Sequence, residues 1–249
     1  MKTAIVAVAG ISSRFNENER NKVLKGIYTI SDERKTLLYS ILRKCIGLDK
    51  VILVGGYQYE NLEKYVLKYQ EEFPFSIELV YNPYFKELGT GYTLKAGLEA
   101  CLKEPDCEEI IMIEGDLFFD ERSFERVKTS CRSVATYNYK LIDSRKAVIA
   151  YINQEKELKY IFSTNHGAVE MKEPFLEIYN SGQIWKFADI DCVKKLMGKL
   201  PEEVWRGTNL LFIETYFAEM RETEREMIEL KIWENCNTRM DYLKYAERM

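Results

Sequence analysis

Histidine is almost absent from this sequence, which contains a single one, His166, among 249 residues. Sites in which several histidines bind a metal are therefore excluded. A Ser-His-Asp triad is not indicated either, because nothing around His166 marks a nucleophile. We expect His166 to be an ordinary loop or strand-end residue beside Gly167. Any chemistry must therefore run on carboxylates, amides, lysine and arginine.

Long apolar runs, paired cysteines and an excess of one charge are also missing. No run approaches the ~20 apolar residues of a transmembrane helix. The 6 cysteines include no Cys-x-x-Cys pair, and the N-terminus does not resemble a signal peptide. The 36 basic and 40 acidic residues are well mixed, so neither a nucleic-acid face nor a membrane-binding patch is indicated. We expect a cytoplasmic protein whose partners are small molecules.

The first half of the chain alternates between strand-like and helix-like patterns. Such alternation is typical of parallel strands joined by crossover helices. We expect one domain, residues 1–249, with an α/β, Rossmann-like fold and a mostly parallel sheet flanked by helices. The expected strands are 5–9, 51–54, 77–81 and 110–113. Three helices are expected between them: one capped by Thr36, one that begins near Leu62 and one that begins near Leu94.

The pattern changes beyond Asp116. After a helix over 121–131, short strand-like runs predict a small antiparallel extension of the sheet that covers one end of a nucleotide site. These runs are 134–139, 147–152, 158–163, 175–179 and 184–187. Helices are expected over 190–199 and 210–222, with a last strand over 227–233. Thr238-x-x-Asp241 predicts a capping box for a terminal helix.

The stretch from Ile5 to Leu24 carries the first candidate site. An apolar run breaks at Gly10 into a polar loop with Arg14 and Lys22. The small residues Gly10, Ser12 and Ser13 let backbone N–H groups approach a ligand, and the two cations suit phosphate oxygens. A solvated surface loop is the alternative for either cation alone.

Two further polar stretches follow expected strands, where ligands of open α/β sheets bind. In Glu87-Leu88-Gly89-Thr90-Gly91, the glycines are expected to expose backbone amides to the edge of a nucleobase, and a plain tight turn is the alternative. In Glu114-Gly115-Asp116, the aspartate directly follows an apolar strand and is placed to hold Mg²⁺. A helix-capping role is the alternative for Asp116.

A last polar stretch, residues 233–238, again joins a strand to a helix. Its Asn237 can offer a carbonyl oxygen to a hard cation that Asp116 also touches, although alone it reads as a turn or cap residue. Together the four stretches supply two cations, a carboxylate and an amide for Mg²⁺, and a turn for the nucleobase. This combination predicts a binding site for a nucleoside triphosphate.

Several of these motifs resemble a known family. AVAGISSRF followed by Lys22-Val23-Leu24 resembles the signature loop of nucleotidyltransferases with the GT-A-like fold, AAG-x-G-x-R with a later Pro-Lys. The segment from Val51 to Tyr57, with Asn82, Tyr92 and Leu94, resembles phosphocholine- and phosphonate-type cytidylyltransferases. LGTGYTLKAGLEA and Asn237-x-Arg239 are similar to N-acetylglucosamine-1-phosphate uridylyltransferases. The resemblance covers most of the chain.

The departures from the family pattern lie in the same motifs. Ser12 replaces a glycine, Asn21 replaces the proline before Lys22, and Asn237 stands where many members have aspartate.

The resemblance implies that an acceptor's phosphate oxygen attacks the α-phosphorus of an NTP and expels pyrophosphate. A phosphate monoester, with a second pKa near ~6, needs no general base for this attack. The implied roles are Lys22 on the α-phosphate and acceptor, Arg14 on the β- and γ-phosphates, and Asp116 and Asn237 as Mg²⁺ ligands. The implied nucleotide-binding residues are Ala7, Ala9, Gly10, Ser12, Ser13, Gly89, Thr90 and Glu114.

Acceptor recognition is expected in the irregular region between Tyr137 and Tyr216. The candidates are Glu177, Tyr179, Asn180, Trp185, Trp205 and Arg206. A quaternary ammonium group on the acceptor would suit an aromatic cage built from Tyr179, Trp185 or Trp205. Ordinary packing is the alternative in a chain with 17 tyrosines and 3 tryptophans.

The leading hypothesis is a Mg²⁺-dependent cytidylyltransferase that transfers CMP from CTP to phosphocholine, a phosphonate or a phosphoramidate such as phosphoglutamine. Decoration of a capsule or other surface polysaccharide is the expected pathway. A UTP- or dTTP-dependent hexose-1-phosphate nucleotidyltransferase and a non-catalytic nucleotide-binding homologue stay open, as does a homodimer. A dinucleotide-dependent oxidoreductase is not indicated, because the spacing of G-x-G-x-x-G is missing after Gly10.

Overall fold

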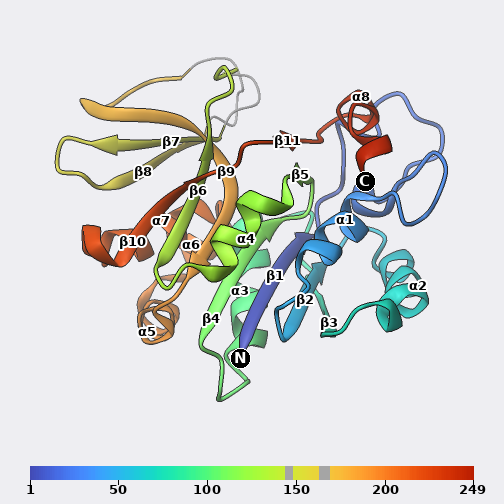
Figure 1. Cartoon of the computed structure of the whole chain (residues 1–249), viewed down its shortest axis with the longest axis horizontal. Helices are drawn as coiled ribbons and strands as arrows, with labels where there is room; N and C mark the ends of the chain where they lie inside the picture. The colour runs from blue at the N-terminus through green and yellow to red at the C-terminus, as the bar shows by residue number, and fades with distance from the viewer. Residues whose placement is uncertain (144–147, 163–168) are drawn as a thin grey trace.

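A computed structural model describes residues 1–143, 148–162 and 169–249. The prediction for His166 lies outside these described residues. The chain forms a nine-stranded sheet whose main path has the order β10-β6-β9-β4-β1-β2-β3 (Figure 1). Four neighbouring strands of this path are parallel. They are β1 (Lys2–Val8), β2 (Lys50–Gly55), β3 (Ser76–Tyr81) and β4 (Glu109–Glu114).

The other half of the sheet is built around one long strand, β9 (Phe175–Phe187), which runs antiparallel to both β4 and β6 (Ser133–Asn138). Strand β10 (Arg225–Glu229) lies parallel to β6 at the edge. Strands β7 (Val148–Asn153) and β8 (Leu158–Phe162) extend the sheet from β9. The predicted α/β class, with a mixed, mostly parallel sheet and a small antiparallel extension, is confirmed.

Strand β9 was expected as two strands, 175–179 and 184–187, and this was wrong. Its register against β6 shifts between Ala135 and Tyr137, and Gln183 within it adopts a left-handed φ of 56°. A bulge inserts an extra residue without ending a strand, and it interrupts the alternating sequence pattern in the same way that a turn does.

Helices cover both faces of the sheet. In Figure 1, α1 (Leu37–Lys44) and α4 (Glu121–Thr129) lie in front of the strands, and α3 (Thr90–Cys101) lies behind them. Successive side chains of β1 alternate between two cores: Ala4 and Val6 pack in the front one and Ile5 in the rear one. The remaining helices are α2 (Tyr59–Tyr69), α5 (Ile190–Lys199), α6 (Glu202–Arg206), α7 (Leu210–Ala218) and α8 (Arg239–Leu243).

Three predicted helix starts are confirmed by their caps. The Thr36 hydroxyl accepts a hydrogen bond from the Tyr39 N–H, and the Asp120 carboxylate accepts one from the Ser123 N–H. The capping box of Thr238 and Asp241 is present at α8. The short helix α6 was not predicted, and no described helix combines the length and the apolar character needed to cross a membrane.

A second, two-stranded sheet was also not predicted. It pairs β5 (Leu117–Phe119) with β11 (Trp233–Asn235) in antiparallel fashion. The predicted strand over 227–233 is thus divided between β10 and β11. Because β5 begins directly after Asp116 and β11 ends shortly before Asn237, this small sheet brings these two residues together. The Cys236 N–H donates to the Asp116 carbonyl oxygen at 2.8 Å.

Candidate functional site

A cavity of about 170 Å³ lies at the carboxyl ends of β1 and β4. Parallel α/β sheets place their ligand sites at this edge. The cavity is lined by Ala7, Val8, Ala9, Gly10, Ser12, Leu24, Lys25, Gly26, Thr90, Thr93, Glu114, Gly115 and Asp116. Six of the eight predicted nucleotide-binding residues line it, and the exceptions are Ser13 and Gly89.

Lys25 is the lysine of this cavity, and the sequence analysis missed it. Its Nζ lies 2.7 Å from Oδ2 of Asp116, and the two side chains are only 15% and 22% exposed. Lys25 opens a 3₁₀ turn, Lys25–Ile27, and its N–H donates to the Ser12 hydroxyl at 3.3 Å. A partly buried ion pair of this kind is less screened by water than one on the surface.

Lys22, the lysine of the predicted motif, lies elsewhere. Its side chain is exposed and lines a separate hollow of about 490 Å³ together with Ser13 and Lys86. Its carbonyl oxygen accepts a hydrogen bond from the Gln58 amide at 2.8 Å. The structure therefore brings Lys25, and not Lys22, to Asp116, and the predicted role of Lys22 stays a prediction.

Glu114 lies two residues before Asp116 and faces the same cavity. Burial, and then the nearby charge of Asp116, raise the pKa of its carboxyl group to about 7, although a hydrogen bond from Asn209 opposes the shift. The Asn209 amide donates to Oε1 of Glu114 at 2.6 Å.

Asn209 also binds Thr90, so it joins two walls of the cavity. The Thr90 hydroxyl donates to the Asn209 side-chain oxygen at 3.1 Å and accepts from the Asn209 N–H at 3.0 Å. Asn209 is only 3% exposed. An asparagine before an apolar helix signals a cap, but this side chain does not cap α7. The position of Asn209 in the sequence therefore suggests a helix cap, and not the bonds to Glu114 and Thr90 that its side chain forms.

The prediction that Gly89 and Gly91 expose their amides to a base was wrong. The Gly89 N–H donates to the Arg206 carbonyl oxygen at 2.9 Å, and the Gly91 N–H donates to that of Gly207 at 3.0 Å. A Cβ on Gly89 would lie 2.1 Å from the Gly207 oxygen. The glycines therefore let this turn pack against the end of α6, and Thr90 is the residue of the turn that reaches the cavity.

Ser12, which replaces a family glycine, keeps a glycine-like backbone. Its φ is 56°, in the left-handed region that non-glycine residues rarely adopt. Its hydroxyl contacts the Gly10 carbonyl oxygen at 3.4 Å as well as the Lys25 N–H. These contacts offset part of the backbone strain and attach the loop to Lys25. Asn21, the other departure in this loop, is exposed.

Arg14 and Asn237, which come from two of the four predicted stretches, are in direct contact. Nη2 of Arg14 donates to Oδ1 of Asn237 at 2.9 Å, and Asn237 is 6% exposed. Asp116 and Asn237 supply a carboxylate and an amide oxygen, the hard donors that Mg²⁺ prefers, and Mg²⁺ commonly takes its other ligands from water and substrate phosphates. The donor types suit this ion, and each is engaged by a cation of the protein in this structure, Asp116 by Lys25 and Asn237 by Arg14. No group of three or more His, Cys, Asp or Glu able to hold a metal occurs among the described residues.

Two of the predicted acceptor-binding residues belong to the hydrophobic core. Trp185 and Trp205 are each 1% exposed and pack in the rear core. The Trp185 indole donates to the Tyr160 hydroxyl at 2.8 Å. Neither ring offers a surface to an acceptor here, so the cage predicted from them is not formed. The abundance of aromatic residues gave no signal that separated core rings from exposed ones.

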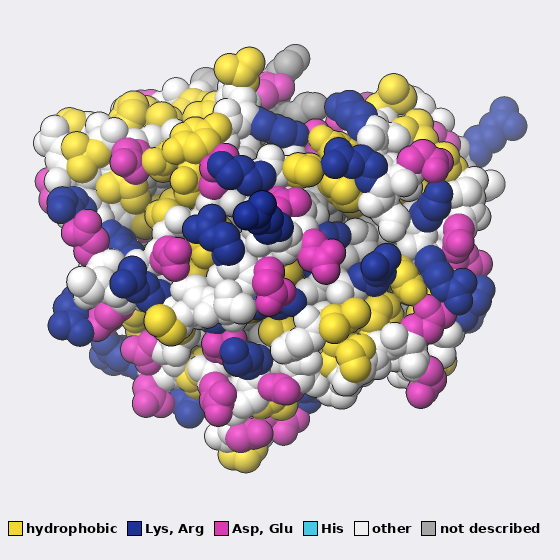
Figure 2. Space-filling view, in the orientation of Figure 1, with side chains coloured by type: hydrophobic (Ala, Val, Ile, Leu, Met, Phe, Trp, Pro, Cys, Tyr) yellow, Lys and Arg dark blue, Asp and Glu magenta, His cyan; other side chains and the backbone are white. Residues whose placement is uncertain are grey.

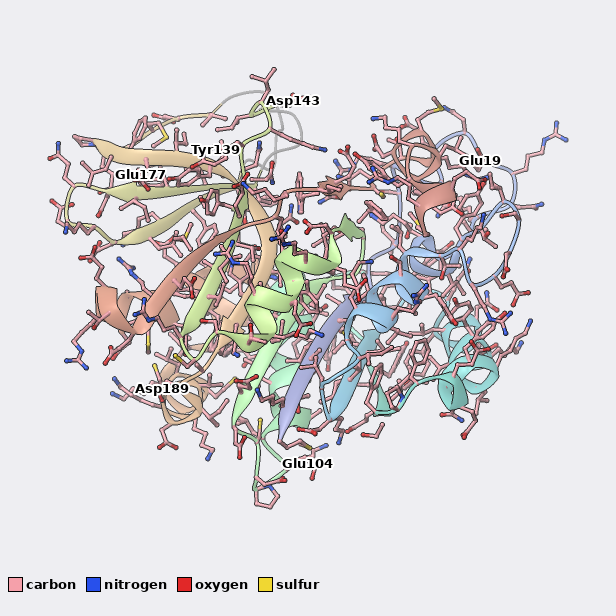
Figure 3. All side chains as sticks on the ribbon, viewed as in Figure 1. Glu19, Glu104, Tyr139, Asp143, Glu177 and Asp189 are labelled. Carbon is pink, nitrogen blue, oxygen red and sulfur yellow. The ribbon has the colours of Figure 1, made fainter. Side chains whose placement is uncertain are left out.

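Two other predicted acceptor residues, Glu177 and Tyr179, belong to or contact a tyrosine cluster that the sequence analysis did not assemble. Tyr137, Tyr139 and Tyr179 pack with ring centroids 4.4 to 5.5 Å apart. Oε2 of Glu177 accepts from the Tyr179 hydroxyl at 2.6 Å. Figure 3 shows Tyr139 and Glu177 on the side of β6 and β9, with Glu19 of the N-terminal loop on the opposite side.

Asn180 and Arg206 are the last two predicted acceptor residues. The Asn180 amide donates to the Lys140 carbonyl oxygen, and Asn180 is 6% exposed. Arg206 is exposed at the end of α6. Acceptor binding by either residue stays a prediction.

The solved structures of similar shape include two CTP-dependent transferases. The inositol-1-phosphate CTP transferase from T. maritima matches with a TM-score of 0.65 and 17% identity, covering 97% of this chain and 91% of that chain. HddC from Yersinia pseudotuberculosis matches with a TM-score of 0.65 and 16% identity, covering 100% and 99% of the two chains.

A third similar structure is the CTP:phosphocholine cytidylyltransferase from Streptococcus pneumoniae (LicC). Its TM-score is 0.65 at 14% identity, and the match covers 99% of this chain and 98% of that chain. At such identities the likeness shows the fold alone, and the expected nucleotidyltransferase fold is confirmed. No curated protein sequence matches this chain. The chain belongs to the family described as "Domain of unknown function (DUF6564)", which matches residues 21–249.

Proposed function

We propose that this protein transfers CMP from CTP to a small phosphorylated acceptor and releases pyrophosphate. The observation that carries this proposal is the pair of Lys25 and Asp116 inside the cavity at the carboxyl ends of β1 and β4. A cation and a carboxylate at the end of a parallel strand, beside a glycine-containing loop, suit the polyphosphate of a nucleotide.

In this proposal Lys25 of the cavity, in place of Lys22, neutralises the α-phosphate. Arg14, on the loop beside the cavity, neutralises the β- and γ-phosphates. Phosphoryl transfer depends mainly on positioning and charge neutralisation, and an acceptor phosphate is already largely ionised at neutral pH, so the proposal needs no general base. A Mg²⁺ ion held by Asp116 and Asn237 would supply further charge neutralisation when bound.

Two observations favour CTP over UTP. Two of the similar solved structures are a CTP transferase and a CTP:phosphocholine cytidylyltransferase. Glu114 lines the cavity with a pKa of about 7, and in its ionised form the oxygen that Asn209 does not bind can accept a hydrogen bond. An acceptor suits the N4 amino group of cytosine, whereas uracil presents an oxygen at that position.

The tyrosine cluster favours an acceptor with a cationic group. Three tyrosine rings beside the carboxylate of Glu177 suit a quaternary ammonium group through cation–π and ionic contacts. One similar structure is a CTP:phosphocholine cytidylyltransferase. Phosphocholine is therefore the first acceptor to test, followed by aminoethylphosphonate and phosphoglutamine. A cytoplasmic location, a role in the decoration of a surface polysaccharide and the formation of a homodimer stay proposals.

The test is a pyrophosphate-release assay with Mg²⁺, in which each of the four NTPs is paired with each acceptor and with a set of hexose 1-phosphates. We expect release with CTP and a phosphorylated acceptor that carries a cation. Release only with UTP or dTTP and a hexose 1-phosphate would replace the proposal by the sugar-nucleotide alternative. Tight NTP binding without release from any pair would contradict catalysis and identify a nucleotide-binding homologue.

A further inference from the structure

A second cavity, of about 470 Å³, lies between α1, α4 and β5. It shares no lining residue with the cavity around Asp116. In Figure 1 the two helices lie side by side in front of the sheet, and Figure 2 shows Lys and Arg side chains over this face among acidic ones. The cations that line the cavity are Arg43, Lys44, Lys128 and Arg248.

Lys44 is the residue that sets this cavity apart. Its Nζ donates to the carbonyl and hydroxyl oxygens of Ser40 at 3.0 and 2.6 Å. It also lies 5.6 and 5.2 Å from the ring centroids of Phe118 and Phe119. Within the described ranges, no carboxylate lies at ion-pairing distance from Lys44, and burial lowers its pKa to about 8. A half-buried lysine without a direct ion-pair partner is costly to keep, and the more distant charges of Glu121 and Asp120 offset only part of the effect of burial on its pKa. A bound anion would offset more of this cost.

Two arginines add to this positive charge. Arg43 is exposed, and the Arg248 guanidinium lies 5.9 Å from the ring centroids of Phe118 and Tyr245. In the part of the chain that the structure describes, neither arginine forms an ion pair with a carboxylate. Arginine suits phosphate oxygens through its planar donors, and lysine suits them as a point charge.

The acidic residues of the cavity are mostly engaged. Both oxygens of Asp120 accept backbone hydrogen bonds, from Ser123 and Ile232. Glu125 forms an ion pair with Lys128 at 2.7 Å. The described lining side chains therefore carry four cations and three carboxylates, and Lys128 is the one of these cations that forms an ion pair.

We propose that this cavity binds the phosphate group of a small molecule through Lys44, Arg43 and Arg248. The volume lies within the ~300–1,000 Å³ of small-molecule sites and exceeds what a phosphate ion fills, so the ligand is a phosphate ester. This site stands apart from the proposed transferase reaction, because its residues do not enter the cavity of Lys25 and Asp116.

The test is calorimetric titration of the full chain with inorganic phosphate and with glycerol 2-phosphate, in a buffer without other oxyanions. We expect both probes to bind the wild type, the ester more tightly. Lys44→Gln and Arg43→Gln should each weaken binding at least about tenfold, because each removes one charge-assisted contact. Lys25→Gln, which removes the cation of the other cavity, should leave this affinity unchanged.

Two controls keep the result clear. Lys44→Gln should melt at least as high as the wild type without phosphate, because it removes a buried, unpaired charge. Arg43 is exposed, so its replacement does not disturb the core even if Lys44→Gln does. Absence of binding to the wild type, or loss of binding in Lys25→Gln with full binding in both other variants, would overturn the proposal. Wild-type affinity in both cavity variants would overturn it equally.

Discussion

The ammonium group of Lys25 lies 2.7 Å from the carboxylate of Asp116, although 91 residues separate them in the sequence. The carboxylate that is proposed to hold Mg²⁺ is therefore already neutralised by a side chain of the protein. A divalent ion and Lys25 compete for the same oxygen, so binding of the ion releases the lysine for a phosphate.

This competition predicts that Lys25→Gln tightens the binding of Mn²⁺, a spectroscopic substitute for Mg²⁺, in the absence of nucleotide. The expected gain is up to about fivefold, since partly exposed ion pairs contribute up to about 1 kcal/mol. Electron paramagnetic resonance of free and bound Mn²⁺ measures it, with Asp116→Asn as the variant that should lose binding. Weaker binding to Lys25→Gln would show that the lysine does not compete.

The left-handed backbone of Ser12 predicts different effects for its two smallest replacements. Ser12→Gly loses the hydroxyl contacts but relieves the strained φ of 56°, whereas Ser12→Ala loses the contacts and keeps the strain. Ser12→Ala should therefore be less stable than Ser12→Gly by about 1 kcal/mol. Urea denaturation of both variants checks this order, and equal stabilities would argue that the loop adopts another conformation in solution.

The contacts of Asn209 predict a role in positioning the nucleotide. Asn209→Ala removes the amide that donates to Glu114 and the side-chain oxygen that accepts from Thr90, and leaves only the backbone N–H of residue 209 on the Thr90 hydroxyl. The Michaelis constant for CTP should therefore rise more than kcat falls. The free energy of unfolding should fall by about 1–3 kcal/mol. Thr215→Ala, on the same helix but bonded only to the Leu211 carbonyl oxygen, is the matched control. A loss confined to kcat would contradict a positioning role.

The pKa of Lys44 predicts a pH-dependent stability. Burial lowers this pKa from 10.5 to about 8, so below pH 8 the folded protein bears the cost of the buried charge. Between about pH 8 and 10.5 the unfolded chain binds more protons, and that cost disappears. Lys44→Met should therefore raise the free energy of unfolding at pH 7, and the gain should shrink as the pH approaches 10. Urea titrations of both proteins across this range measure the difference, and a gain independent of pH would refute the assignment.

The strand exits could be predicted from the sequence because they depend on local patterns and on one topological rule. Apolar runs that end in polar residues located Asp116 and Asn237, and the shared edge of the parallel strands β1 and β4 explains why the loop that carries Arg14 leaves β1 on the side of Asp116. The strands β5 and β11 that complete this arrangement have three residues each, too few to show a period.

The partners within the site could not be predicted in the same way. Lys25 is three residues from Lys22, and only the 3₁₀ turn decides which of them points to Asp116. Asn209 reaches Thr90 across 119 residues. The burial of Trp185 and Trp205 likewise depends on packing between distant elements, which their local sequence does not encode.

The central claim is that Lys25 and Asp116 form the centre of a nucleotidyl-transfer site. The most direct test is the initial rate of pyrophosphate release from CTP and the accepted phospho-acceptor by the wild type, Lys25→Gln and Lys22→Gln. Loss of the charge that faces the α-phosphate should lower kcat by about 10²–10³ in Lys25→Gln. The side chain of Lys22 is exposed and lies outside the cavity. The kcat of Lys22→Gln should therefore stay within about tenfold of the wild-type kcat, a smaller loss than the removal of one transition-state contact causes. Near-normal turnover by Lys25→Gln together with an inactive Lys22→Gln would contradict the account.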